Sequence, residues 1–326
     1  MPEIFITRRI FSEAKEKLAD EGIDYGINDS GRRLSKRELM ENLPGKDGLI
    51  CLLNDEVDGD VLNASSELKM IANIAVGYDN IDVEAATSRG IMISNTPGVL
   101  TETTADLSIG LLLAAARRIP EADRFVRQEN WEGWELIQPQ QGIDVFGKTL
   151  GIVGMGRIGT AVARRARNGF DMDVVYYSRS RKRGVEEELG AEYVELNELL
   201  ARSDFVSLHT PLTPETEGMI STPEFELMKD DSILINVARG PVVDEDALVR
   251  AIKEGEIRGA GLDVFEKEPE VHPELKNLTE SVVLAPHIGS ASRETRHKMA
   301  DIGVKNMIAG LRGEKPANII NPEVID

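Results

Sequence analysis

The chain has 326 residues, of which 41% are hydrophobic and 29% are charged, and its formal net charge at pH 7 is −19. This length predicts about two domains, and the composition excludes a disordered or fibrous protein. The negative charge argues against non-specific binding to nucleic acids or anionic membranes, and the most apolar window, residues 107–116, is too short to span a bilayer.

The only cysteine, Cys51, lies in an apolar run at residues 49–53. A single cysteine excludes an intrachain disulfide and a Cys-x-x-Cys metal or redox pair, so we predict a packing role for it. The N-terminus lacks the basic segment and long apolar stretch of a secretory signal. We therefore expect a cytoplasmic protein.

In the first hundred residues, short apolar runs alternate with amphipathic segments, which is typical of β-α-β units with a parallel sheet. We expect strands at residues 4–6, 48–53, 70–75 and 91–93. Residues 101–118 predict a helix, since acidic and threonine residues begin it and Arg117 and Arg118 end it before Pro120. It is apolar nearly all round, so we expect it to be buried between domains or against a partner subunit.

Residues 121–145 carry both tryptophans, Trp131 and Trp134, and are expected to be irregular. They either cross another surface or pack on their own domain. A second α/β series follows, with strands expected at residues 148–153, 174–177, 205–208, 233–237, 261–264 and 282–285. The last helix, residues 294–311, and the tail from residue 317 are expected to pack on the first domain. The predicted fold is therefore α/β, with two doubly wound parallel sheets.

A glycine-rich turn joins the strand at residues 151–153 to a helical segment, and it reads Gly154-Met155-Gly156-Arg157-Ile158-Gly159. In G-x-G-x-x-G the first glycine permits the tight turn, the second lets the backbone approach a pyrophosphate, and the third allows close packing of helix on strand. The N–H groups at the start of the helix then face the phosphates. This context predicts a dinucleotide site more strongly than a plain glycine turn.

The end of the next strand favours NADP over NAD. About twenty residues after the glycine turn, where NAD enzymes carry an acidic residue for the ribose, the chain reads Tyr177-Ser178-Arg179-Ser180-Arg181-Lys182-Arg183. Guanidinium and hydroxyl groups suit a 2′-phosphate, which a carboxylate would repel. NAD remains possible, and a solvated basic loop is the simpler alternative.

Polar residues follow four other strands, and in open α/β sheets ligands bind beyond these carboxyl ends. The segments concerned are His209-Thr210-Pro211, Val237-Ala238-Arg239, Asp263 with the later Glu268, and His287-Ile288-Gly289. Four histidines without an H-E-x-x-H pattern argue against a metal site, so we expect none.

Three of these side chains have the types that reduction of a 2-oxo acid requires. A cation such as Arg239 can hold the substrate carboxylate or carbonyl oxygen, and an acid such as His287 can protonate that oxygen. A carboxylate such as Glu268 beside the imidazole would orient it and raise its pKa. Each also has a structural alternative: a strand-end ion pair, a surface charge or a hydrogen-bonded histidine.

Several motifs together resemble the D-isomer-specific 2-hydroxyacid dehydrogenases, and the resemblance runs essentially from end to end. They are residues 75–82 (AVGYDNID), 95–98 (NTPG), 154–159 (GMGRIG), 236–240 (NVARG), 261–265 (GLDVF) and 286–289 (PHIG). Within that family the chain is most similar to the glyoxylate/hydroxypyruvate reductases, particularly archaeal ones.

The resemblance implies a Rossmann coenzyme domain at residues 99–287, inserted into a flavodoxin-like substrate domain at residues 1–98 and 288–326, and a homodimer built on the coenzyme domain. It implies that Arg239, Glu268 and His287 are catalytic, and that the N–H groups of Val76 and Gly77 bind the substrate carboxylate together with Arg239 and His287. The implied coenzyme contacts are Gly154, Met155, Gly156, Arg157, Ile158, Ser178, Arg179, Ser180, Thr210, Pro211, Val237, Ala238, Arg239, Asp263, His287 and Gly289.

The implied activity is NADPH-preferring reduction of glyoxylate, hydroxypyruvate or a similar small 2-oxo acid to the (R)-2-hydroxy acid, with His287 as proton donor. A 3-phosphoglycerate dehydrogenase is an alternative, although the chain lacks a long regulatory C-terminal domain. A formate dehydrogenase is disfavoured because Glu268 stands where that subfamily has glutamine. A nucleotide-sensing binding module is the alternative of another class.

Overall fold

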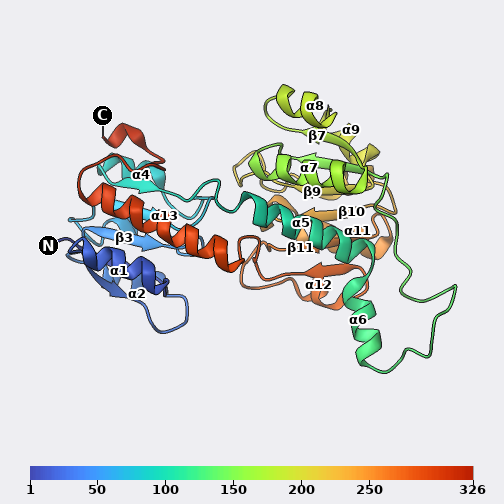
Figure 1. The fold of residues 1–326 in the computed structure, drawn as a ribbon, viewed down its shortest axis with the longest axis horizontal. Helices are drawn as coiled ribbons and strands as arrows, with labels where there is room; N and C mark the ends of the chain where they lie inside the picture. Colours follow the sequence, from blue (N-terminus) through green and yellow to red (C-terminus); the bar gives the residue numbers. More distant parts are fainter. Residues whose placement is uncertain (326) are drawn as a thin grey trace. The chain divides into compact units, whose positions relative to one another are not determined.

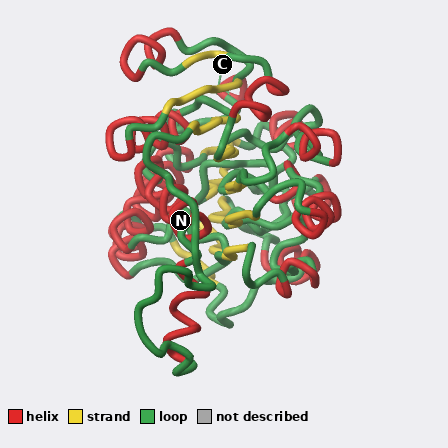
Figure 2. The backbone as a smooth tube through the Cα atoms, turned by 90° about the vertical axis from the view of Figure 1, so that its right-hand side faces the viewer, coloured by secondary structure: helices red, strands yellow, loops and turns green. Residues whose placement is uncertain are grey.

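The computed structural model describes residues 1–325, which separate into two compact units with one parallel sheet each (Figure 1). Unit 1 contains Met1–Leu100 and the described residues from Ala291 onward, and unit 2 contains Thr101–Ser290. Figure 2 shows strands with helices on either side of them. The expected class, two doubly wound α/β sheets, is confirmed.

The sheet of unit 1 has the strand order β2-β1-β3-β4-β5, which is the flavodoxin-like order. The strands are β1 (Glu3–Ile6), β2 (Asp24–Ile27), β3 (Gly48–Cys51), β4 (Met70–Asn73) and β5 (Met92–Ser94). Every residue of β3 and β4 is buried, because helices cover both faces of a central parallel strand. Because β3 and β4 are parallel, their carboxyl ends lie at the same edge of this sheet.

The helices of unit 1 are α1 (Ser12–Asp20), α2 (Lys36–Asn42), α3 (Gly59–Leu62), α4 (Val83–Ser88) and α13 (Arg293–Leu311), with a 3-10 turn at Pro322–Val324. The long helix α13 packs on β3, β4 and β5. Its glycines allow this approach, because a Cβ at Gly310 would lie 2.6 Å from the sulfur of Met70. The tail returns to β5, where Ile320 donates its N–H to the carbonyl of Ile93 at 2.7 Å.

The sheet of unit 2 has the order β12-β11-β10-β9-β6-β7-β8, in which the first strand along the chain, β6, lies inside the sheet as in a Rossmann fold. Its strands are β6 (Thr149–Val153), β7 (Asp173–Tyr177), β8 (Glu192–Tyr193), β9 (Phe205–Leu208), β10 (Ile233–Asn236), β11 (Gly259–Leu262) and β12 (Val282–Leu284).

The helices of unit 2 are α5 (Thr101–Ala116), α6 (Ile119–Arg127), α7 (Arg157–Phe170), α8 (Arg183–Leu189), α9 (Leu196–Arg202), α10 (Thr222–Leu227), α11 (Glu245–Glu254) and α12 (Pro273–Asn277), with a 3-10 turn at Gly240–Val242. Among the described residues, no helix is long and apolar enough to cross a membrane. Helix α5 packs on α7, β10 and β11 of its own unit. This packing accounts for its apolar surface without a partner subunit.

Some predicted boundaries are wrong. The helix expected over residues 101–118 ends at Ala116, since Arg118 adopts a left-handed conformation (φ 52°), and a new helix, α6, begins at Ile119. The irregular segment therefore starts after Arg127, because Pro120 lies in the first turn of α6 rather than ending α5. Strands β2 and β8 were not expected, because short edge strands with few buried residues leave no apolar run in the sequence.

Candidate active site

The glycine-rich turn between β6 and α7 is shaped for close approach. Gly154 has φ +100°, and a Cβ there would lie 2.7 Å from the carbonyl carbon of His209. A Cβ at Gly159 would lie 2.3 Å from the Gly154 oxygen, so the helix can pack on the turn only with glycine at this position. No side chain caps α7 at Gly156, which leaves the first N–H groups of the helix available to an anion.

The other residues of this turn can contact a ligand mainly through their backbone. The Met155 side chain is buried in the core, so only its backbone can face a ligand. Arg157 and Ile158 form the first turn of α7, where the backbone N–H groups point out of the helix end. The turn therefore binds through its backbone rather than through side chains.

Two buried polar atoms beside this turn have no hydrogen-bond partner among residues 1–325: Nδ1 of His209 and Oγ1 of Thr210. Burial lowers the pKa of His209 to about 3, so the ring is neutral, and its Nε2 lies 2.9 Å from Ser207 Oγ. Unpaired buried polar atoms are costly and need a partner. Together with the exposed helix end, they fit a bound dinucleotide; Pro211 follows them directly.

In the segment after β7, Arg181 is already paired with a carboxylate and Arg179 is not. Arg181 Nε lies 2.8 Å from Glu186 Oε1, which also accepts the Tyr176 hydroxyl at 2.6 Å. Lys182 Nζ donates to Ser180 Oγ at 2.7 Å. Arg179 is exposed, and no hydrogen bond or ion pair joins its side chain to the described part of the chain. Arg183 is likewise exposed without such a partner, but Arg179 lies between Ser178 and Ser180, which makes it the candidate to bind a phosphate. The Thr213 side chain and, more weakly, the charge of Arg179 lower the pKa of Glu215.

The carboxyl ends of β10, β11 and β12 lie in register at one edge of the sheet, with Asn236 opposite Leu262 and Leu262 opposite Leu284. Val237, Ala238 and Arg239 follow β10; Asp263 follows β11; and His287 and Gly289 follow β12. The expected convergence of these segments at a single edge is what the parallel register produces.

His287 and Glu268 are in direct contact. Nδ1 of His287 lies 2.8 Å from Glu268 Oε2, and the other carboxylate oxygen accepts the N–H of Phe265 at 3.1 Å. Both side chains are about three-quarters buried, at 24% and 27% exposed. The carboxylate is thus fixed from both sides, and it fixes the orientation of the imidazole.

The backbone at His287 is held in a left-handed conformation, with φ 52°. This conformation is unfavourable for a side chain larger than glycine, so the surroundings must impose it. Asp263 does so: its carbonyl accepts the His287 N–H at 2.8 Å, and its carboxylate accepts the N–H groups of Ile288 and Gly289 at 2.7 Å each. Burial raises the pKa of Asp263. Asp263 therefore shapes the turn that presents His287.

Arg239 is placed by an asparagine that the sequence analysis did not single out. Asn236 accepts the N–H of Ala238 and donates to the carbonyl of Arg239, both at 3.0 Å. The next residue, Gly240, has no room for a side chain, because a Cβ would lie 1.9 Å from the carbonyl carbon of Phe265. The Arg239 turn and the segment that leads to Glu268 are therefore locked together.

Val76 and Gly77 lie beyond β4 in unit 1, whereas all the other predicted site residues lie in unit 2. The structure thus brings Glu268 into contact with His287 and places Arg239 on the same sheet edge. Among residues 1–325, no group of three or more His, Cys, Asp or Glu side chains could hold a metal ion.

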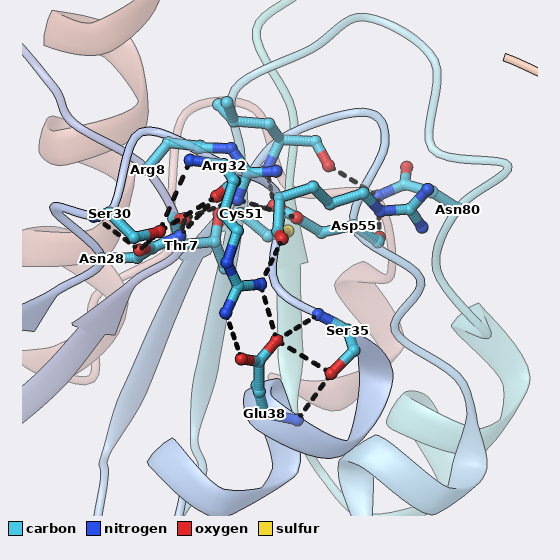
Figure 3. Close-up of polar contacts among 12 residues, drawn as sticks. Thr7, Arg8, Asn28, Ser30, Arg32, Ser35, Glu38, Cys51, Asp55 and Asn80 are labelled. Carbon is cyan, nitrogen blue, oxygen red and sulfur yellow. Dashed lines mark hydrogen bonds and ion pairs between the residues drawn. The ribbon is translucent and has the colours of Figure 1, made fainter. Parts of the chain in front are cut away.

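Unit 1 also contains a cavity of about 370 Å³ whose lining includes Arg32, Lys36 and Asp55. Two of its cations are already paired: Arg32 binds Glu38, and Lys36 binds Asp58 and, at 2.8 Å, Asp60. Figure 3 shows the Arg32–Glu38 pair beside the Ser35 cap of α2. The lining also carries two carboxylates, Asp55 and Glu56, whose charges oppose the binding of an anion in this cavity.

Comparison with known proteins agrees with the geometry. Residues 109–289 match the family model described as D-isomer specific 2-hydroxyacid dehydrogenase, NAD binding domain. The chain belongs to the D-isomer specific 2-hydroxyacid dehydrogenase family, and it is an NAD(P)-dependent oxidoreductase.

Individual relatives match over nearly the whole chain. The glyoxylate reductase of Thermococcus litoralis is 52% identical over 99% of this chain and 98% of that protein. A protein from Thermus thermophilus has a solved structure that superposes with a TM-score of 0.91, at 44% identity over 98% of this chain and 99% of the other. The NADPH-dependent glyoxylate/hydroxypyruvate reductase of Sinorhizobium meliloti, solved with NADP and malonate, gives 0.87 at 34% identity, covering 98% and 96%.

Proposed function

We propose that the protein reduces glyoxylate, hydroxypyruvate or a similar small 2-oxo acid to the (R)-2-hydroxy acid, with NADPH preferred over NADH. The observation that carries this proposal is the 2.8 Å contact between His287 and Glu268 at the sheet edge that also carries Arg239. It is supported by the 52% identity to a glyoxylate reductase over nearly the full chain.

In this proposal unit 2 is the coenzyme-binding domain and unit 1 is the substrate-binding domain. Coenzyme contacts are assigned to the backbone of residues 154–158, to Ser178, Arg179 and Ser180, and to the segments after β9 to β12, namely Thr210, Pro211, Val237, Ala238, Arg239, Asp263, His287 and Gly289. The match of residues 109–289 to the NAD binding domain supports the assignment of unit 2 as the coenzyme-binding domain.

The chemistry follows from the contacts of His287. When bound, the nicotinamide coenzyme supplies the hydride that reduces carbon 2 of the substrate. Because Glu268 holds Nδ1, Nε2 is the ring nitrogen that can donate a proton to the substrate oxygen. Arg239 attracts the substrate carboxylate, and the N–H groups of Val76 and Gly77 bind its oxygens.

The preference for NADPH rests on the segment after β7. Neither Asp nor Glu occurs from Ser178 to Arg183, and Arg179 is exposed and unpaired within the described chain. An unpaired guanidinium suits a 2′-phosphate, and a carboxylate that would repel this phosphate is missing from the segment.

The direct test is the loss of NADPH absorbance with glyoxylate and hydroxypyruvate, with 3-phosphoglycerate and NADP as the comparison. We expect turnover only with the small 2-oxo acids. His287→Ala should lower turnover by about 10²- to 10⁴-fold and change NADPH affinity by less than about threefold. Turnover of 3-phosphoglycerate alone, or unchanged turnover in His287→Ala, would contradict the proposal.

We also propose a homodimer built on unit 2. Helix α6 and the loop after it extend away from the other elements of this unit (Figure 1) and expose large apolar side chains, among them Trp134 at 77% and Ile137 at 78%. Exposed apolar groups gathered in one segment favour an interface. Light scattering should give about twice the 35.9 kDa chain mass, and Trp134→Ser combined with Ile137→Ser should shift it toward the monomer. A cytoplasmic location stays a prediction.

A further inference from the structure

The turn that follows β4 has its carbonyl oxygens occupied by donors from other segments of unit 1. Asn95 Nδ2 donates to the carbonyl of Val76 at 2.7 Å, and Asn73 Nδ2 donates to the carbonyl of Gly77 at 2.9 Å. The N–H of Thr96 donates to the carbonyl of Ala75 at 2.8 Å. Three consecutive carbonyls are therefore fixed in direction.

Two N–H groups of the same turn, by contrast, are left without a hydrogen-bond acceptor in the described part of the chain. Within residues 1–325, neither Val76 nor Gly77 has a hydrogen-bond acceptor for its N–H. In a trans peptide, the carbonyl of one residue and the N–H of the next point in opposite directions. The bond from Thr96 to Ala75 therefore sets the direction of the Val76 N–H, and the bond from Asn95 to Val76 sets that of the Gly77 N–H.

Asn95 is itself held on both sides of its backbone. Its N–H donates to the carbonyl of Asn318 at 3.2 Å, and its carbonyl accepts from Asn306 Nδ2 on α13 at 3.2 Å. These bonds come from the C-terminal helix and tail of unit 1. The Asn95 side chain therefore has a fixed base from which to orient the Val76–Gly77 peptide.

The other end of the turn is joined to the loop after β3. Asn73 Nδ2 also lies 3.2 Å from Asn80 Oδ1, and Asn80 Nδ2 donates to the carbonyls of Leu52 and Asp55 at 3.1 and 2.9 Å. Figure 3 shows Asn80 beside Asp55, which accepts the Thr7 hydroxyl and the N–H of Leu52. Asn73 is fully buried. A change in the conformation of this turn would therefore also disturb the loop after β3.

We propose that Asn95 is a positioning residue that orients the Gly77 N–H, which forms a preformed pair for one carboxylate with the Val76 N–H that the Thr96 bond orients. Asn73 supports this pair by anchoring the far end of the turn at the carbonyl of Gly77. The inference rests on the proposed function, which assigns the substrate carboxylate to these N–H groups. A pair that is oriented before binding loses no free energy in being ordered, so it binds the carboxylate in the ground state and the transition state alike. Loss of the orientation should raise KM and leave kcat nearly unchanged.

The experiment compares Asn95→Ala and the equally sized Asn95→Asp with wild type, using glyoxylate and the uncharged analogue methylglyoxal, with NADPH. We expect KM for glyoxylate to rise about tenfold and kcat to stay within about twofold. For methylglyoxal, kcat/KM should change by less than about twofold, because it has no carboxylate to bind. Asn73→Ala should raise the KM for glyoxylate in the same direction but by less, because its bond fixes the Gly77–Tyr78 peptide at the far end of the turn.

The matched control is Asn321→Ala. This buried asparagine accepts the Ile93 N–H at 2.8 Å and donates to Thr87 and Ile91, so its loss weakens unit 1 without touching the Val76–Gly77 turn. We expect a lower melting temperature and an unchanged KM. A similar KM rise in this control, an unchanged glyoxylate KM in all Asn95 and Asn73 variants, or equal losses on both substrates would overturn the inference. Failure of wild type to reduce glyoxylate would instead refute the proposed function.

Discussion

The proposed preference for NADPH over NADH rests on one exposed charge, that of Arg179. Replacing Arg179 by alanine removes the guanidinium that lies between Ser178 and Ser180. This group has no hydrogen bond or ion pair within the described chain, whereas that of Arg181 is paired with Glu186. At about 4 Å in water, two unit charges interact by about 1 kcal/mol, so a phosphate with nearly two charges loses about 2 kcal/mol. This energy corresponds to about a thirtyfold weaker Kd for NADPH.

The assay is a fluorescence titration of NADPH and NADH at low ionic strength, repeated at high salt. In Arg179→Ala we expect weaker NADPH binding, unchanged NADH binding, and a smaller effect of salt on NADPH, because screening acts on the lost charge. Arg181→Ala is the comparison: its guanidinium already binds Glu186 at 2.8 Å, so the loss of NADPH affinity should be smaller. An unchanged ratio of the two Kd values in Arg179→Ala would refute the assignment of the 2′-phosphate to this segment.

Two further predictions concern packing and pH. Gly240→Ala should destabilise the protein by more than about 3 kcal/mol in urea unfolding, because its Cβ would lie 1.9 Å from a backbone carbon of Phe265; Gly184→Ala, which meets nothing within 4 Å, should not destabilise it. Burial lowers the pKa of His209 from its ordinary 6.5 to about 3. Between these two pH values the unfolded state binds a proton at this residue and the folded state does not. Stability should therefore fall as the pH drops, by up to about 1.4 kcal/mol per pH unit, and His209→Gln should remove this part of the slope; parallel pH profiles for the two proteins would contradict it.

Most of the fold was predictable from the sequence, because buried parallel strands leave continuous apolar runs. Strands β3, β4, β6 and β9 are such runs, and the structure confirms them. The edge strand β2 escaped prediction, since none of its residues Asp24–Ile27 is fully buried and they form no continuous apolar run. The helix end predicted at Arg118 was wrong because a proline such as Pro120 can begin a helix as well as follow one.

The candidate site was predictable to the extent that it follows the strands. Arg239, Asp263 and His287 stand directly after apolar runs, and the parallel register places such residues at one edge. Side chains that act on distant backbone were not found, because nothing near Asn95 in the sequence indicates that its amide meets the carbonyl of Val76. The same holds for Gly240. Only the structure shows that the backbone of Phe265 leaves no room for a side chain at this position.

The two stretches that build unit 1 are separated by the whole of unit 2. Helix α13, which packs on β3, β4 and β5, is synthesised only after all of unit 2, and until then these strands lack the helix that covers one of their faces. Unit 2, by contrast, is continuous and can fold as soon as Ser290 has emerged. During synthesis the N-terminal strands of unit 1 therefore remain without α13 until the whole of unit 2 has been made.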